Sequence, residues 1–150
     1  YQYVLDTAKL ARAQALETVL VSNGQINSPY LKNLLPWITA WNIDLKCFSE
    51  EGYRKLGGDW QNTLATIEAA NSAAHVEITT LVVPGLSDNL DNFQAEVDLL
   101  ASLKPQPVLH LTRYFPRYHY QKPATSKDLI WEMAEIAQTK LARVELGNMW

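Results

Sequence analysis

The sequence lacks several patterns on which common functional sites depend. Its 150 residues include one cysteine, Cys47, so the chain alone cannot form an internal disulfide or supply a multi-cysteine metal or iron–sulfur site. Its three histidines have no partner at metal-ligand spacing, which argues against a zinc site. Glycine-rich phosphate loops and the G-x-S-x-G nucleophile motif are also absent. The signatures of zinc, nucleotide-phosphate and serine-nucleophile sites are therefore missing.

Charge and hydropathy narrow the class of protein further. A formal net charge of -3 and a pI near 5.6 argue against broad affinity for nucleic acid or anionic membranes. No apolar run reaches the ~18 to 20 residues that cross a bilayer, and the start "YQYVLDTAKL" does not read as a secretory signal. We therefore expect a cytoplasmic protein that binds neither nucleic acid nor membranes. The hydrophobic fraction of 47% is enough for one sizeable core, which predicts a single domain over residues 1–150.

Helix-like and strand-like segments alternate along the whole chain. Runs rich in β-branched and apolar residues predict strands at "TVLVSN", "AWNIDLK", "HVEITTLVV", "PVLHLTRYF" and "RVELGN", and apolar stripes at helical spacing predict five helices. The segment "SEEGYRKLGG" (49–58) is expected to be a loop, with Asp59 capping the helix after it. Repeated βα units predict an α/β fold with a parallel sheet. Both an open doubly wound sheet and part of a barrel fit this pattern.

Polar side chains gather where the predicted strands end, and in either architecture ligands bind at that edge. Asp44 and Lys46 are two residues apart on a strand, so both project to one face while Leu45 projects to the other. Cys47 lies on the face opposite Lys46 and is expected to be a buried, inert thiol. His110 is expected to be a core histidine. The candidate site residues are Ser22, Asn23, Asp44, Lys46, Thr80 and Arg113.

The spacing of Asp44 and Lys46 leaves several interpretations open. The spacing fits a self-neutralising ion pair at the rim of the sheet, and it equally fits a pair of partners for a small zwitterionic or anionic ligand. A Schiff-base aldolase that uses Lys46 is one alternative, although the neighbouring carboxylate argues against a neutral amine. A non-catalytic module that holds a small ligand or an assembly partner is another.

Longer motifs carry a family resemblance. The segments "SNG" (22–24), "NIDLK" (42–46) and "TTLVVPGLSDN" (79–89), in that order, resemble radical S-adenosylmethionine enzymes of the pyruvate formate-lyase activating type. The segments "HLTRYFPRY" (110–118), "PAT" (123–125) and "LGN" (146–148) are most similar to the branch called the AmmeMemoRadiSam system radical enzyme. The resemblance covers essentially the whole chain.

The resemblance implies a TIM-like partial (βα)6 barrel. Such enzymes bind a [4Fe–4S] cluster through three cysteines and reductively cleave S-adenosylmethionine to a 5′-deoxyadenosyl radical that abstracts hydrogen from a substrate. The resemblance implies that Asn23 and its neighbours, Asp44 and Lys46 line the cofactor side of the barrel, and that the turn 83–85 shapes the adenosyl end. Thr80 and Arg113 are further expected cofactor-binding residues. An electron donor such as flavodoxin or ferredoxin, and a protein or small-molecule substrate, are also implied.

The single cysteine departs from this family pattern. We expect the chain to be the C-terminal part of a parent oxidoreductase, without the N-terminal cluster-binding region and inactive alone. The strand "TVLVSN" would then leave an open sheet edge, which predicts self-association.

Overall fold

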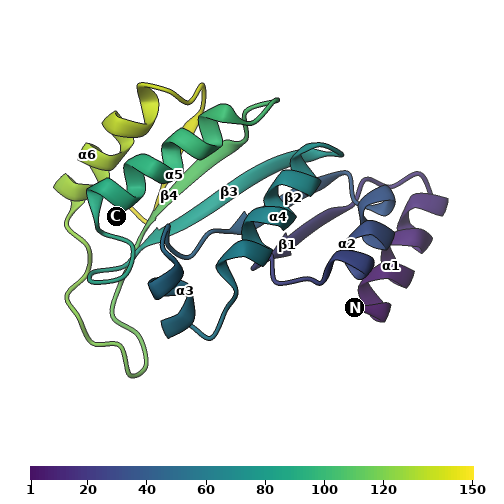
Figure 1. Ribbon diagram of the computed structural model, residues 1–150, viewed down its shortest axis with the longest axis horizontal. Coiled ribbons are helices and arrows are strands. Elements are labelled where there is room, and N and C mark those ends of the chain that lie inside the picture. The colour runs from purple at the N-terminus through teal and green to yellow at the C-terminus, as the bar shows by residue number, and fades with distance from the viewer.

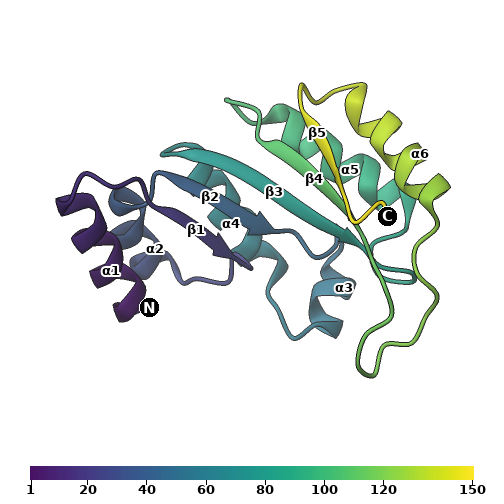
Figure 2. The same ribbon diagram turned by 180° about the vertical axis from the view of Figure 1, so that it is seen from behind.

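The computed structural model describes residues 1–150, and its strands lie side by side with helices packed on one side of them (Figures 1 and 2). The strands are β1 (Val19–Ser22), β2 (Ala40–Asp44), β3 (His75–Val82), β4 (Val108–Arg113) and β5 (Val144–Gly147). The helices are α1 (Gln2–Ala13), α2 (Ser28–Leu34), α3 (Glu50–Lys55), α4 (Trp60–Asn71), α5 (Leu90–Ser102) and α6 (Lys127–Gln138), with a short 3-10 helix η1 (Leu35–Trp37).

All five strands are parallel and follow one another in the order β1-β2-β3-β4-β5. This confirms the prediction of an α/β fold built from βα repeats. The strand order never reverses, and Figure 2 shows the sheet from the side that no helix covers. A doubly wound sheet has helices on both faces and a reversal of order, so the observed arrangement is the barrel-like alternative.

The core lies between the sheet and the helices. Along β2 the side chains alternate, with Trp41 and Ile43 almost fully buried and Asn42 and Asp44 half-buried. Strand β3 repeats the alternation, because Val76, Ile78 and Thr80 are buried while the residues between them are not. The helix-covered face is therefore apolar, and we call the opposite face the uncovered face. A period of two along each strand is what separates the two faces.

Helix α3 corrects the sequence prediction, because it lies inside the segment that was expected to be a loop. The Ser49 hydroxyl accepts a hydrogen bond from the Gly52 N–H at 3.1 Å and caps the helix, and two glutamates occupy its first turn. Polar and glycine residues dominate the segment and masked this short helix. The chain therefore has six α-helices rather than five. The predicted cap at Asp59 is confirmed, because its side chain accepts a hydrogen bond from Asn62 N–H.

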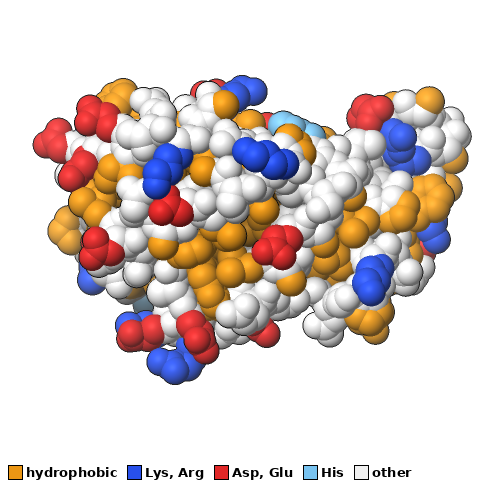
Figure 3. All heavy atoms as spheres, turned by 45° about the horizontal axis from the view of Figure 1, so that its top comes forward, with side chains coloured by type: hydrophobic (Ala, Val, Ile, Leu, Met, Phe, Trp, Pro, Cys, Tyr) orange, Lys and Arg blue, Asp and Glu red, His pale blue; other side chains and the backbone are white.

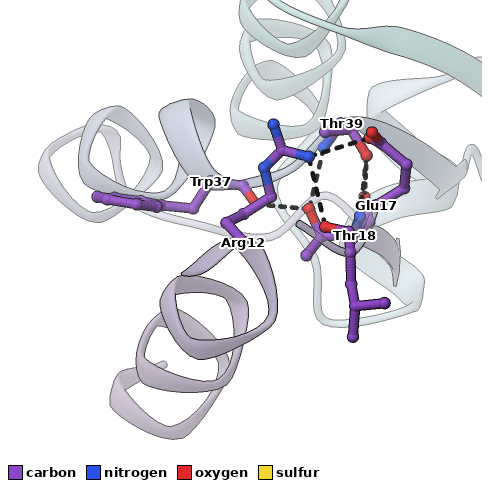
Figure 4. Close-up of polar contacts among 6 residues, drawn as sticks. Arg12, Glu17, Thr18, Trp37 and Thr39 are labelled. Carbon is purple, nitrogen blue, oxygen red and sulfur yellow. Dashed lines mark hydrogen bonds and ion pairs between the residues drawn. The ribbon is translucent and has the colours of Figure 1, made fainter. Parts of the chain in front are cut away.

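Hydrogen bonds between threonines fix the starts of the first two strands to each other (Figure 4). The Thr18 N–H donates to the Thr39 hydroxyl at 2.9 Å, and that hydroxyl donates to the Thr18 carbonyl at 2.8 Å. The Thr18 hydroxyl donates to the carbonyl of Trp37 at 2.5 Å, and Arg12 pairs with Glu17 nearby at 3.2 Å. These contacts fix the register between β1 and β2, and the register sets how the carboxyl ends of the two strands lie relative to each other.

Strand β1 pairs only with β2, so its outer edge is free in this structure. The side chains of Val19 and Val21 are 67% and 70% exposed. An exposed edge with apolar side chains is the type of surface to which another strand adds. Self-association through this edge stays a prediction.

Two further surface properties bear on partners. On the side that Figure 3 shows, acidic and basic side chains are scattered among hydrophobic ones and do not form a continuous surface of one charge. No helix combines the length and the apolarity that crossing a membrane would need. The expectations of a cytoplasmic location and of no nucleic-acid partner remain predictions.

Candidate functional site at the carboxyl ends of the strands

Polar side chains form cross-strand rows on the uncovered face. The register pairs Asp44 of β2 with Thr79 of β3, and Thr79 with His110 of β4, so these three residues share one row. The row before it contains Asn42 and Glu77. The Thr79 hydroxyl joins the rows by donating to the Asn42 side-chain oxygen at 3.0 Å. The uncovered face is therefore a polar surface toward its carboxyl edge.

Asp44 and Lys46 meet on this surface. Lys46 Nζ lies 2.5 Å from Asp44 Oδ2, and their side chains are 41% and 32% exposed. Leu45 between them is fully buried, which confirms that the charged pair and the leucine project to opposite faces. The Tyr53 hydroxyl accepts a hydrogen bond from the Lys46 N–H at 3.2 Å and positions the main chain. The pair is half in solvent, and a ligand can reach it.

A cavity of about 230 Å³ opens beside Lys46. It is lined by Asn23, Gln25, Lys46, Tyr53, Leu56 and Gly58. Gln25 fixes its wall, because its side chain accepts from the Asp59 N–H at 2.9 Å and donates to the Asp59 carbonyl at 2.8 Å. The structure thus brings Asn23 and Lys46 together at one cavity, as the sequence predicts for residues at neighbouring strand ends.

Ser22 and Asn23 form the turn that leaves β1. The Ser22 hydroxyl accepts a hydrogen bond from the Gly24 N–H at 3.1 Å, and the Asn23 side-chain oxygen accepts one from the Gln25 N–H at 3.1 Å. Gly24 has a φ of +73°, a conformation that favours glycine. Ser22 pairs with Ile43 in the register and so lies on the helix-covered side, where its visible role is to hold this turn.

Thr80 is not brought to the same surface. It lies on the helix-covered face, 1% exposed, and its hydroxyl donates to the carboxyl group of Glu96 at 2.5 Å. Glu96 is itself 1% exposed, and burial raises its pKa to about 8 although the Thr80 hydrogen bond opposes the rise. Thr80 is separated from Asp44 by the thickness of the sheet.

Arg113 lies at the end of β4, apart from the cavity beside Lys46. Its Nε donates to the Thr125 carbonyl at 2.7 Å, and its guanidinium lies over the Phe115 ring, with Cζ 4.7 Å from the ring centroid. It lines a larger cavity of about 710 Å³ that shares no residue with the first. Of the six candidates, Asn23 and Lys46 line one cavity and Arg113 lines the other. Asp44 pairs with Lys46 on the uncovered face, Ser22 holds the turn after β1, and Thr80 lies in the core.

Sequence reasoning missed a histidine–glutamate cluster on the uncovered face. Glu77 lies between two rings, with His110 Nε2 at 2.7 Å from one carboxylate oxygen and His75 Nε2 at 3.2 Å from the other. Hydrogen bonding from His75 is the largest influence on Glu77 and lowers its pKa; burial opposes this, and hydrogen bonding from His110 lowers the pKa further. His110 is thus a half-buried residue of this face rather than a core histidine. The sequence did carry a signal for this cluster: Glu77 and Thr79 are two residues apart on one strand, so their side chains share a face.

The expectation of an inert Cys47 agrees with its environment. Its side chain is buried, its thiol donates to the Ser49 carbonyl at 3.8 Å, and burial raises its pKa. No group of three or more histidine, cysteine, aspartate or glutamate side chains is arranged to hold a metal ion. The residues of this chain therefore do not fit a cysteine-bound iron–sulfur cluster.

Comparison with known proteins identifies the fold. A domain of pyruvate-formate lyase-activating enzyme from Bacteroides vulgatus superposes with a TM-score of 0.83 at 15% identity, covering 98% of this chain and 91% of that one. A radical SAM methyltransferase from Sphaerobacter thermophilus superposes with a TM-score of 0.67 at 13% identity, covering 89% of this chain and 41% of that one. The chain therefore has the fold of a radical SAM partial barrel.

A sequence relative adds little about activity. An uncharacterized protein of Methanocaldococcus jannaschii is 30% identical over 99% of this chain, and the chain spans 45% of that protein's length. No protein-family model matches the chain. The fold is thus shown by structure, and the activity has to be argued from the site.

Proposed function

We propose that this chain is the S-adenosylmethionine-binding part of a radical SAM enzyme of the pyruvate formate-lyase activating type, nearest to the AmmeMemoRadiSam branch. The observation that carries the proposal is the Asp44–Lys46 pair, which lies half-exposed at the carboxyl end of β2 on the uncovered face. In parallel α/β folds this edge is where ligands bind. The fold neighbours support the radical SAM part of this assignment.

The donor set at this edge fits the amino-acid end of S-adenosylmethionine. Lys46 offers three N–H donors for a carboxylate, and Asp44 offers carboxylate oxygens for an ammonium group. Lys46 and Asp44 neutralise each other at 2.5 Å. A bound zwitterion would pair its carboxylate with Lys46 and its ammonium group with Asp44, so two ion pairs replace one and no charge is left unpaired. Asn23 lies at the adjoining cavity and supplies a neutral amide. When bound beside a reduced cluster, this cofactor supplies a carbon radical for hydrogen abstraction.

The cluster has to be supplied from elsewhere. Cys47 is buried and is the sole cysteine, so these residues cannot ligate a [4Fe–4S] group. We infer that the ligands belong to a parent protein, that the chain alone is inactive in catalysis, and that the parent takes electrons from a flavodoxin or ferredoxin. The share of the archaeal relative that the chain spans, 45%, is in keeping with this inference.

Binding of S-adenosylmethionine to the chain should depend on the zwitterion. We expect it to bind more tightly than 5′-methylthioadenosine, which lacks the amino and carboxylate groups, by at least about tenfold, because charge-assisted contacts at Asp44 and Lys46 would be lost. Equilibrium dialysis of both compounds against the chain measures the ratio. Equal affinities, or no binding of either compound, would contradict the assignment of this site.

The single cysteine also favours a second candidate, a non-catalytic module that holds a small ligand. This candidate predicts that the gene encodes no cysteine triplet outside the chain, which sequencing decides. The Schiff-base aldolase is not favoured, because the amine of Lys46 contacts a carboxylate at 2.5 Å and a nucleophilic lysine has to be neutral.

A further inference from the structure

Charge is unevenly distributed at the end of the molecule that carries α6. The segment from the last residue of β4 to the cap of α6, "RYFPRYHYQKPATS" (113–126), contains arginine and lysine but no acidic residue, although the chain as a whole has a net charge of -3. The exposed side of α6 is acidic. The segment and the helix lie at the same end of the molecule, opposite the end that α1 and β1 form (Figures 1 and 2).

The exposed side of α6 carries negative charge that the chain does not balance. Asp128, Glu132 and Glu135 are spaced by four and three residues, so they share a face of the helix with Trp131, whose side chain is 54% exposed. We call these four residues the acidic face, and none of its acids forms an ion pair. Like charges at these spacings destabilise a helix, and the last turn of α6 has no basic residue. Positive charge from outside the chain would therefore stabilise this face.

The turn at residues 117–122, which we call the basic turn, carries such positive charge. Arg117 and Lys122 are exposed and form no ion pair, and Tyr118 between them is 84% exposed. Arg117 and Tyr120 exchange main-chain hydrogen bonds at 3.2 and 3.0 Å, and the Tyr120 hydroxyl donates to a carbonyl of the turn after β3 at 2.7 Å. The basic turn is thus positioned before any partner binds, which lowers the entropic cost of association.

We propose that a second copy of this chain binds at this end, in a two-fold symmetric dimer in which the basic turn of each copy contacts the acidic face of the other. A two-fold axis through the end that carries both surfaces exchanges them, so the same contact forms twice. The two surfaces are complementary in charge, and both expose an aromatic side chain. Tryptophan, tyrosine and arginine are the residue types that contribute most to binding at protein interfaces.

The net charge of -3 on each copy does not prevent this association. Salt at physiological ionic strength screens exposed charges that are more than about 8 Å apart, whereas the contacting pairs of opposite sign are closer than that. The contact is separate from the free edge of β1, which lies at the other end of the molecule (Figures 1 and 2). It is also independent of the proposed function, because neither surface includes Asp44 or Lys46.

Sedimentation equilibrium of the whole chain over a range of concentrations tests the proposal. We expect a dimer, and we expect Arg117→Glu with Lys122→Glu, the basic-turn variant, to raise its dissociation constant by at least about tenfold, because each reversal acts at both contacts. Glu132→Lys with Glu135→Lys, the acidic-face variant, should have the same effect. A chain that stays monomeric up to about 1 mM would leave these surfaces to a different partner and overturn the proposal.

A mixture of the two variants gives the sharper result. In their heterodimer the two reversed surfaces meet each other and the two unchanged surfaces meet each other, so both contacts are complementary again. We therefore expect the mixture to dimerise about as tightly as the original chain, although each variant alone does not. Failure of the mixture to dimerise, or a dimer that both variants retain alone, would show that the contact lies elsewhere.

A control variant separates this contact from the effect of net charge. Lys32→Glu with Arg54→Glu, at exposed positions of α2 and α3 without ion-pair partners, changes the net charge by the same amount as the basic-turn variant. It should dimerise like the original chain, and it should bind the acidic-face variant more weakly than the basic-turn variant does. If the control and the basic-turn variant behave alike in both measurements, net charge alone explains the association and the proposal is wrong.

Discussion

Raising the pH from 4.5 to about 8 is expected to lower the free energy of unfolding by about 5 kcal/mol through Glu96 alone, since each pH unit in that interval costs about 1.4 kcal/mol. The folded state keeps this carboxyl protonated up to about pH 8, whereas the unfolded chain releases the proton near pH 4.5. Between those values the folded state binds more protons, so stability falls as the pH rises. Below pH 4.5 both states are protonated and the loss disappears.

The variant Glu96→Gln isolates this effect, because it removes the ionisation and keeps an oxygen that accepts from Thr80. Urea unfolding at several pH values should show equal stabilities for the two proteins near pH 4 and a growing advantage of the variant toward pH 8. Glu68→Gln, at an exposed position of α4, should keep the pH slope of the original chain. If the stability difference between Glu96→Gln and the original chain does not change with pH, Glu96 is not a buried carboxyl without a compensating charge.

Replacing Lys46 by Met should lower the affinity for S-adenosylmethionine by about 30-fold, equivalent to about 2 kcal/mol. The variant removes the partner of the cofactor's carboxylate and leaves Asp44 unpaired, so that its charge repels the same carboxylate. Affinity for 5′-methylthioadenosine, which has no carboxylate, should not change. Equilibrium dialysis with both compounds measures the two effects.

Two further variants complete this test. Lys32→Met, at an exposed position of α2, removes one positive charge elsewhere and should leave both affinities unchanged. In the double variant Lys46→Met and Asp44→Asn, the repulsion by an unpaired Asp44 is absent. The double variant should therefore bind S-adenosylmethionine more tightly than the sum of the binding free-energy losses of the two single variants predicts. Additive losses would mean that Asp44 and Lys46 do not act as a pair on the ligand.

Alternation along the chain was enough to predict the fold class, because strand and helix periods are properties of local sequence. The choice between a barrel segment and a doubly wound sheet was not predictable in this way. It depends on which face of the sheet each helix covers. The alternation of apolar and polar residues around Ile43 is the same in a barrel segment and in a doubly wound sheet. Helix α3 was missed because only six residues, 50–55, form it, and no apolar stripe follows its cap at Ser49.

The candidate site was predicted in part. Parity along β2 was sufficient to place Asp44 and Lys46 together, because side chains two apart share a face. Thr80 was wrongly grouped with that pair. It lies two residues after Ile78 on the same strand, so strand alternation already assigns its side chain to the face of Ile78. Glu96 is a comparable case, because it lies three residues after Phe93 and four before Leu100, in the middle of the apolar stripe of α5. A charged residue within such a stripe was the available signal for a buried carboxyl.

The most direct test of the proposed function is formation of 5′-deoxyadenosine by the full-length product of the gene that encodes this chain. The protein is reconstituted with iron and sulfide without oxygen, reduced with dithionite and given S-adenosylmethionine. We predict iron–sulfur absorbance and release of 5′-deoxyadenosine, with the absorbance retained and the release largely lost in Lys46→Met. A protein that gains no iron–sulfur absorbance and forms no 5′-deoxyadenosine would contradict the assignment to the radical SAM enzymes.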